Sequence, residues 1–232
     1  MQVDNLIIEI TRRCNKACYF CLRGEAQNID ISDEILETFL KRFSYINTLT
    51  ITGGEPSLAP QKIMRIIEII KQNRISLNSF YIATNGEEAS SEFVNSLLQL
   101  YLECEDPEMS SVDISNTDNY DEYSDAVRTL QVFRFTNLKY NDYSEANWID
   151  EGLAQENGVG KRAVSVYPIV VKESEYDDIS IEEGDIYLNA LGDIIGCCNL
   201  SYESQDDYTI CHYDDDDLLG AIKKYNAKLE CE

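Results

Sequence analysis

The stretch Leu6-Ile-Ile-Glu-Ile-Thr-Arg-Arg-Cys-Asn-Lys-Ala-Cys-Tyr-Phe-Cys-Leu22 places three cysteines directly after an apolar, strand-like run. Cys14, Cys18 and Cys21 have C-x3-C-x2-C spacing, which lets a short loop wrap three thiolates around one face of a cubane iron–sulfur cluster. Cysteine thiolates normally supply a ligand to each iron of such a cluster. Three cysteines therefore predict a cluster in which one iron is left open for a small molecule.

Two other interpretations of this loop remain. A structural zinc site needs a fourth ligand and a closed tetrahedral shell, and the single histidine, His212, is far away in the sequence. Buried structural cysteines are the second alternative, but Arg12, Arg13, Asn15 and Lys16 make the loop polar. Both alternatives fit the sequence less well than a cluster does.

Apolar runs alternate with helical patterns along most of the chain. Strands are expected at residues 6–10, 48–52, 80–84, 112–115, 132–136 and 163–171, and helices at 32–43, 60–73, 91–104, 120–130 and 143–157. Ser32 is a typical capping residue, and Pro60 suits the first turn of a helix. Six strands that alternate with helices predict an α/β fold with a parallel sheet.

Three further motifs stand at the ends of predicted strands. They are Thr52-Gly-Gly-Glu-Pro56, Ala83-Thr-Asn-Gly86 and Ser115, the last residue of the run 112–115. In parallel α/β barrels the functional residues gather at the carboxyl ends of the strands. We therefore expect these motifs and the cysteine loop to lie on one face of the fold.

The motifs, in this order, resemble those of the radical S-adenosylmethionine (SAM) enzymes. The resemblance implies a partial (β/α)6 barrel, similar to a TIM barrel. It also implies that Cys14, Cys18 and Cys21 bind a [4Fe-4S] cluster whose open iron chelates SAM. Phe20 matches the aromatic position before the family's third cysteine.

The same resemblance assigns roles to the strand-end motifs. Gly53, Gly54 and Glu55 would hold the methionine end of SAM, because glycines permit close backbone approach and a carboxylate accepts charge-assisted hydrogen bonds from an ammonium. A plain turn is the alternative interpretation of this motif. Asn85 and Ser115 are expected ribose contacts. The sequence identifies no catalytic acid–base residue, because the radical carries the chemistry, and no adenine contact.

The last part of the chain has a different pattern, so we expect a core at residues 1–183 and an extension at 184–232. Residues 185–198 predict a β-hairpin, and residues 217–226 predict a helix. The hairpin followed by cysteine resembles a truncated SPASM or twitch domain of peptide-modifying family members. Cys197, Cys198, Cys211 and Cys231 could form a second metal site. We expect a single cluster, because adjacent strand residues face apart and chain ends fray.

Composition limits the partners. The formal net charge is −24, and Lys and Arg are absent from residues 75–127 and 173–222. A nucleic-acid surface needs a basic patch, so no nucleic-acid partner is expected. No apolar stretch approaches about 18 residues, which predicts no membrane span. The start of the chain does not have the pattern of a secretory signal. The eight cysteines suit a reducing cytoplasmic location.

Three functions remain after these steps. The first is a radical SAM enzyme that cleaves SAM reductively to a 5′-deoxyadenosyl radical and abstracts hydrogen from a peptide, protein or small molecule. It would take its electron from a donor of the flavodoxin or ferredoxin type. The second is a glycyl-radical-enzyme activase, in which the C-terminal hairpin is not expected. The third is a non-catalytic iron–sulfur or zinc module that binds partners through its acidic face and does not cleave SAM.

Overall fold

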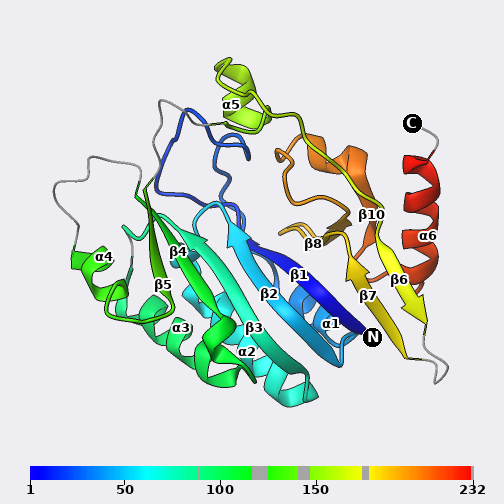
Figure 1. Ribbon diagram of the computed structural model, residues 1–232, viewed down its shortest axis with the longest axis horizontal. Helices are drawn as coiled ribbons and strands as arrows, with labels where there is room; N and C mark the ends of the chain where they lie inside the picture. Colours follow the sequence, from blue (N-terminus) through cyan, green and yellow to red (C-terminus); the bar gives the residue numbers. More distant parts are fainter. Residues whose placement is uncertain (88, 117–124, 141–146, 174–177, 231–232) are drawn as a thin grey trace.

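A single mixed sheet forms the centre of the computed structural model, which describes residues 1–87, 89–116, 125–140, 147–173 and 178–230. Within these residues the sheet has ten strands, in the order β10-β9-β8-β1-β2-β3-β4-β5, and β7 joins β6 to β1 (Figure 1). None of the helices in the described ranges combines the length and the apolar composition that a membrane crossing needs.

Five neighbouring strands of the sheet run parallel, as the sequence predicts. They are β1 (Gln2–Thr11), β2 (Tyr45–Gly53), β3 (Ser76–Thr84), β4 (Ser111–Asn116) and β5 (Thr136–Tyr140). Their side chains alternate: Leu49 and Ile51 are fully buried, whereas Thr50 between them is half-buried. One face of the sheet is therefore apolar and the other polar.

Helices cover the apolar face and lie behind the sheet in Figure 1. They are α1 (Asp33–Leu40), α2 (Pro60–Asn73), α3 (Ser91–Glu103) and α4 (Asp125–Leu130). Ser32 caps α1 as expected, because its Oγ accepts a hydrogen bond from the Ile35 amide at 3.1 Å. Short 3-10 turns lie at Pro56–Leu58 and Pro107–Met109. The first part of the helix predicted at 120–130 lies outside the described residues.

The prediction of a strand at residues 132–136 is wrong. Gln131 to Phe135 form turns, closed by backbone hydrogen bonds such as Phe133 N to Leu130 O at 3.1 Å, and β5 begins only at Thr136. The two phenylalanines stack on each other with ring centroids 5.4 Å apart. Apolar residues that pack in a turn thus gave the same local signal as a buried strand.

The prediction of a sixth strand at residues 163–171 is also wrong for most of its length. Only its last two residues belong to β6 (Val170–Glu173), which pairs antiparallel with β7 (Ile179–Glu183). Pro168 lacks a backbone N–H, and Val164 and Val166 pack against a small core around Ile7. The parallel partners of β1 on this side are β7 and β8 (Ile186–Leu188).

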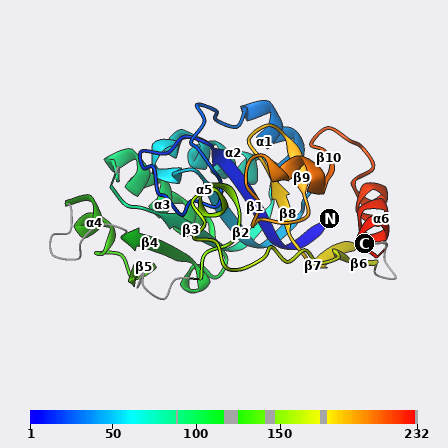
Figure 2. The same cartoon turned by 90° about the horizontal axis from the view of Figure 1, so that it is seen from above.

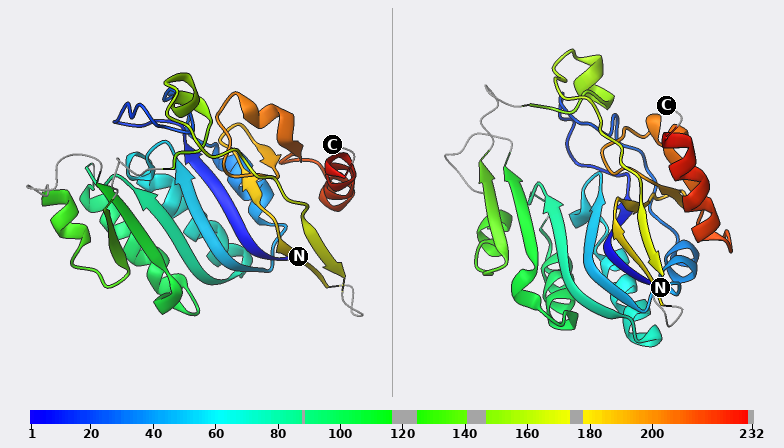
Figure 3. Two further views of the ribbon diagram at one scale, coloured as in Figure 1. Left: turned by 45° about the horizontal axis from the view of Figure 1, so that its top comes forward. Right: turned by 45° about the vertical axis from the view of Figure 1, so that its right-hand side comes forward.

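The C-terminal hairpin is present, formed by β8 and β9 (Asp193–Ile195), followed by β10 (Thr209–His212). The chain ends in α6 (Leu218–Leu229), capped by Asp217. Since β5 and β10 stand at opposite ends of the strand order, the sheet is an open, partial barrel. Both views of Figure 3 show α6 at the side of the sheet farthest from β5.

Candidate functional site

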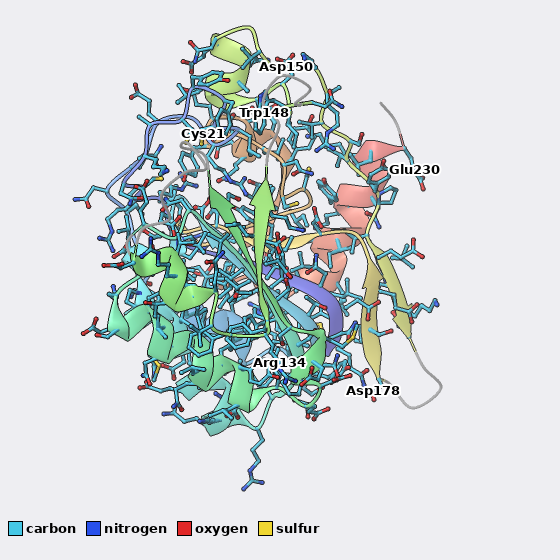
Figure 4. All side chains as sticks on the ribbon, turned by 60° about the vertical axis from the view of Figure 1, so that its left-hand side comes forward. Cys21, Arg134, Trp148, Asp150, Asp178 and Glu230 are labelled. Atoms are coloured by element: carbon cyan, nitrogen blue, oxygen red, sulfur yellow. The ribbon has the colours of Figure 1, made fainter. Side chains whose placement is uncertain are left out.

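The cysteine loop leaves β1 at its carboxyl end, beside the ends of β2 and β3. Figure 4 shows Cys21, Trp148 and Asp150 at this end of the sheet, with Arg134 and Asp178 at the other. The short helix α5 (Gly152–Glu156) lies over the middle of the sheet when the molecule is seen from above (Figure 2). The motifs at the ends of β2 and β3 contact the start of the cysteine loop, as the sequence predicts.

The glycine pair at the end of β2 packs directly against the start of the cysteine loop. The amides of Gly54 and Glu55 donate to the carbonyls of Thr11 and Arg13, both at 2.8 Å. A Cβ atom at Gly53 would stand 2.3 Å from the Thr11 oxygen, and one at Gly54 would stand 2.4 Å from the Arg13 oxygen. In this structure glycine is required for close approach of two backbone segments, whereas the sequence suggested close approach to a ligand.

Glu55 is 2% exposed, and its carboxylate accepts hydrogen bonds from within the protein. Oε1 accepts the Ser57 amide at 3.0 Å and the Thr84 hydroxyl at 2.5 Å, and Oε2 accepts the Asn85 amide at 2.8 Å. A carboxylate offers about four acceptor positions. Glu55 therefore ties the end of β2 to the end of β3, a structural role that the motif alone did not reveal.

Asn85 joins the end of β3 to the cysteine loop. Its Nδ2 donates to Oδ1 of Asn15 at 2.8 Å, and its own Oδ1 accepts the Glu87 amide at 3.0 Å. Lys16 and Glu87 add an ion pair with an N–O distance of 2.8 Å. Sequence reasoning singled out Asn85 but not its partners, because polar loop residues carry no signal of which residues they contact.

Arg13 and Asp30 fix the loop from the side of α1. The Asp30 carboxylate accepts Arg13 Nε and Nη2 at 2.8 and 2.9 Å and the Thr11 hydroxyl at 2.6 Å. Arg13 Nη2 also donates to the Leu58 carbonyl at 2.8 Å. Burial opposes ionisation of Asp30, but the hydrogen bonds from Arg13 and Thr11 outweigh it and lower the pKa of this carboxyl.

The three loop cysteines are half-buried thiols. The Cys21 amide donates to the Cys18 carbonyl at 3.0 Å, and the Lys16 amide donates to Cys14 Sγ at 3.4 Å. Burial raises the pKa of Cys14, with smaller contributions from Glu55 and Cys21 nearby. In the described ranges no three His, Cys, Asp or Glu side chains gather around a point that could hold one metal ion. Cluster thiolates each bind a different iron, so they stand farther apart than zinc ligands.

An aromatic stack and α5 cover the loop from outside. Phe20 stacks on Trp148 with centroids 4.0 Å apart and planes 11° from parallel. The Leu153 amide donates to the Cys21 carbonyl at 2.9 Å, and a Cβ at Gly152 would stand 2.5 Å from the Gly24 nitrogen. Trp148 and Gly152 were not predicted as site residues, because their contacts are distant in sequence.

The polar face of the sheet extends from this site down the open barrel. Tyr81 donates to Asp113 at 2.9 Å, and Lys139 pairs with the same carboxylate at 3.3 Å. Burial and the bond to Asp113 raise the pKa of Tyr81 to about 12. Asn137 donates to the Ser111 hydroxyl at 2.8 Å. Ser115, a predicted ribose contact, is half-buried at the carboxyl end of β4, on the same edge as Glu55.

The C-terminal thiols lie in different surroundings. Cys197 is 2% exposed among apolar side chains, and the pKa of Cys198 is raised to about 12 by burial and by Asp185. Cys211 lies on β10, where burial raises its pKa to about 11. Cys231 lies outside the described residues. Whether these cysteines bind a second metal stays a prediction.

Comparison with known proteins gives one family. Residues 8–137 match the Radical SAM superfamily. A GTP 3′,8-cyclase of Limosilactobacillus fermentum is 27% identical over 150 residues, which are 60% of this chain and 45% of that protein. A probable GTP 3′,8-cyclase of Thermococcus kodakarensis is 33% identical over 90 residues, 36% of this chain and 28% of that protein. The chain thus spans less than half the length of these curated relatives.

Solved structures show the same fold. A histidine-tagged anSMEcpe with bound AdoMet aligns with 97% of this chain and 82% of its own, with a TM-score of 0.53 and 14% identity. Streptococcus suis SuiB bound to precursor peptide SuiA aligns with 98% of this chain and 66% of its own, with a TM-score of 0.50 and 12% identity. Because the family match covers more than half of the sequence and contains the cysteine loop and all three strand-end motifs, the chain belongs to the radical SAM superfamily.

Proposed function

We propose that this protein cleaves SAM reductively at a [4Fe-4S] cluster and abstracts hydrogen from a substrate on the polar face of the barrel. The observation that carries the proposal is the meeting of the cysteine loop with the ends of β2 and β3. Gly54, Glu55 and Asn85 hold this loop by backbone and side-chain hydrogen bonds.

The thiols of Cys14, Cys18 and Cys21 fit a cubane cluster. All three belong to one short loop, they are half-buried, and a backbone amide donates to Cys14 Sγ. Hydrogen bonds to cluster sulfurs and solvent exposure are the means by which proteins tune cluster potentials. When bound, the cluster would pass to SAM the electron that cleaves it. A separate electron donor would supply that electron to the cluster.

The residues around the loop would bind and orient SAM. Glu55 has three internal donors, which leave about one acceptor position of its carboxylate for the SAM ammonium. Asn85 and Ser115 lie on the same edge, at the ends of β3 and β4, where they could contact the ribose. Phe20, a residue of the loop, stacks on Trp148, and this stack would shield one side of the loop from water.

A peptide is the substrate class that the polar face supports best. A triphosphate such as GTP, which the names of the sequence relatives give as substrate, is normally held by Arg, Lys or metal ions. Among the described polar-face residues of β2 to β5, Lys139 is the single cation, and it pairs with Asp113. Hydroxyl and amide groups instead suit the uncharged backbone of a peptide. A solved relative, SuiB, is by its title bound to a precursor peptide.

The cluster proposal is tested by changing all three loop cysteines to Ala. After anaerobic reconstitution, wild type should hold about four irons per chain and release 5′-deoxyadenosine when given SAM and reductant. The triple variant should lose both the iron absorbance and the product, while the Cys104→Ala control should retain them. SAM cleavage by the triple variant would contradict the proposal.

The substrate class is tested with GTP as the probe. Wild type incubated anaerobically with SAM, reductant and GTP should give no cyclised nucleotide by mass spectrometry, because the polar face has no free cation in its described part. Its basal 5′-deoxyadenosine release should be unchanged by GTP. A cyclised GTP product would replace the peptide assignment by a nucleotide one and leave the SAM-cleavage proposal intact.

A further inference from the structure

The C-terminal segment 186–205 contacts both ends of the cysteine loop. Arg12 stands two residues before Cys14, and Arg23 stands two residues after Cys21. Each guanidinium lies over a tyrosine ring of this segment: Arg12 Cζ is 4.4 Å from the Tyr202 centroid, and Arg23 Cζ is 5.0 Å from the Tyr187 centroid. Arg12 and Arg23 therefore lie at the two ends of the cysteine loop, and both contact residues that are far away in sequence.

The Arg12 contacts are buried and specific. Its side chain is 4% exposed, and Nε pairs with Glu9 Oε1 at 2.7 Å. Nη2 donates to Gln205 Oε1 at 2.6 Å, and Nη1 donates to Gln27 at 3.1 Å. Gln205 is itself 1% exposed, and its oxygen also accepts Asn189 Nδ2 at 3.1 Å. Removing a partner from a buried charge such as this one is strongly destabilising, which favours the observed position of Arg12.

Glu9 extends the connection into the hairpin. It is fully buried in β1 and accepts the Tyr187 hydroxyl and, at 3.0 Å, the Ala190 amide. Glu9 thus binds Arg12, the first residue after β1, and the turn between β8 and β9. Removal of one partner would leave a buried charge incompletely satisfied, which is the costly case for buried polar groups.

Arg23 makes the second attachment through side chain and backbone. Its Nη1 donates to the Leu200 carbonyl at 2.7 Å, and its carbonyl accepts the Tyr202 amide at 3.0 Å. Tyr202 therefore contacts both arginines, by its ring on Arg12 and by its amide on Arg23.

We propose that residues 186–205 act as a clamp that positions the cysteine loop, with Arg12 and Arg23 as positioning residues. The assignment of a cluster to this loop rests on the proposed function, whereas the clamp itself rests on the contacts above. The loop between the two arginines carries all three cysteines, so the clamp sets where the thiols stand. The C-terminal extension then belongs to the cofactor site through the contacts of its backbone and side chains with Arg12 and Arg23.

The clamp is tested first without the cluster, by hydrogen exchange on the full-length apo-protein. Gln205→Leu removes the acceptor for Arg12, and Tyr187→Phe is a milder change that removes one donor to Glu9. In both variants the backbone amide hydrogens of residues 12–24 should exchange about tenfold faster than in wild type, which is the effect of one lost buried hydrogen bond. The amide hydrogens of α2 should stay protected. Gln61→Leu, the same change at an exposed glutamine of α2, should leave the loop as in wild type.

The reconstituted variants give the second readout. With iron content near that of wild type, Tyr187→Phe should change the electron paramagnetic resonance spectrum of the reduced cluster and raise the KM for SAM. Equal loss of exchange protection over the whole chain, or an unchanged loop with an unchanged spectrum, would overturn the clamp. If wild type fails to bind iron, the proposed function fails, yet the exchange comparison still decides whether the clamp exists.

Discussion

At the scale of single residues, Glu55 shows how one side chain can serve the fold and a ligand. The sequence motif predicts a SAM contact, and the structure adds three internal donors to the same carboxylate. These bonds explain why an acid is 2% exposed at the end of a strand. An effect of substituting Glu55 therefore has two separate sources, lower stability of the fold and weaker binding of the ligand.

Glu55→Ala should destabilise the apo-protein by about 3 kcal/mol, because it leaves buried donors without an acceptor. The free energy of unfolding in urea measures this. Glu68→Ala, at an acid of α2 whose side chain is 55% exposed, should change it by less than about 0.5 kcal/mol. If stability is unchanged and only SAM affinity falls, the internal hydrogen bonds of Glu55 contribute little and the sequence-based interpretation is sufficient.

At the scale of elements, α5 depends on two glycines in different ways. Gly152 and Gly158 both have positive φ, +52° and +65°. A Cβ at Gly152 would overlap the backbone of Cys21 to Gly24, whereas a Cβ at Gly158 would meet nothing within 4 Å. Gly152 therefore allows α5 to rest on the cysteine loop, and Gly158 only turns the chain.

Gly158→Ala should lower the free energy of unfolding by about 1 kcal/mol, the cost of a left-handed conformation for alanine. Gly152→Ala should cost clearly more, because the same backbone penalty is joined by a steric overlap. It should also speed hydrogen exchange at the Leu153 amide, which donates a hydrogen bond to the Cys21 carbonyl. Equal effects of the two substitutions would show that α5 does not press on the loop.

At the scale of the whole molecule, the net charge of −24 sets the electrostatics. Surface carboxylates repel one another, and most ion pairs between the described residues have an exposed partner, such as Lys41–Glu37 and Lys223–Glu173. Exposed pairs contribute little to stability. Self-repulsion should therefore exceed the attraction of the surface pairs.

Raising NaCl from about 10 mM to about 150 mM shortens the Debye length from about 30 Å to about 8 Å. The Tm should rise, because repulsion between distant carboxylates is screened more than contacts between close pairs. Differential scanning calorimetry measures the shift, and choline chloride at the same ionic strength separates screening from Na⁺ binding. A falling Tm would mean that the surface ion pairs stabilise the fold more than the net charge destabilises it.

The sequence predicted the parts of the fold that have a local cause. Helix α2 begins and ends where its apolar period and Pro60 indicate, and Ser32 caps α1. The hairpin at β8 and β9 follows from its alternating residues. The strand prediction at residues 132–136 failed because stacked phenylalanines in a turn give the same sequence pattern as a strand. The strand prediction at residues 163–171 failed because a run of apolar residues does not reveal whether a neighbouring strand is available for pairing.

By itself, the sequence determined the family, the parallel α/β class and the loop that carries the three cysteines, because these depend on residue type and spacing along the chain. Only the tertiary structure decided what holds that loop. Glu9 meets Tyr187, Arg12 meets Gln205 and Leu153 meets Cys21 across separations that no local pattern records. Buried polar groups must be satisfied wherever the fold brings a partner, so their partners are known only once the chain is folded.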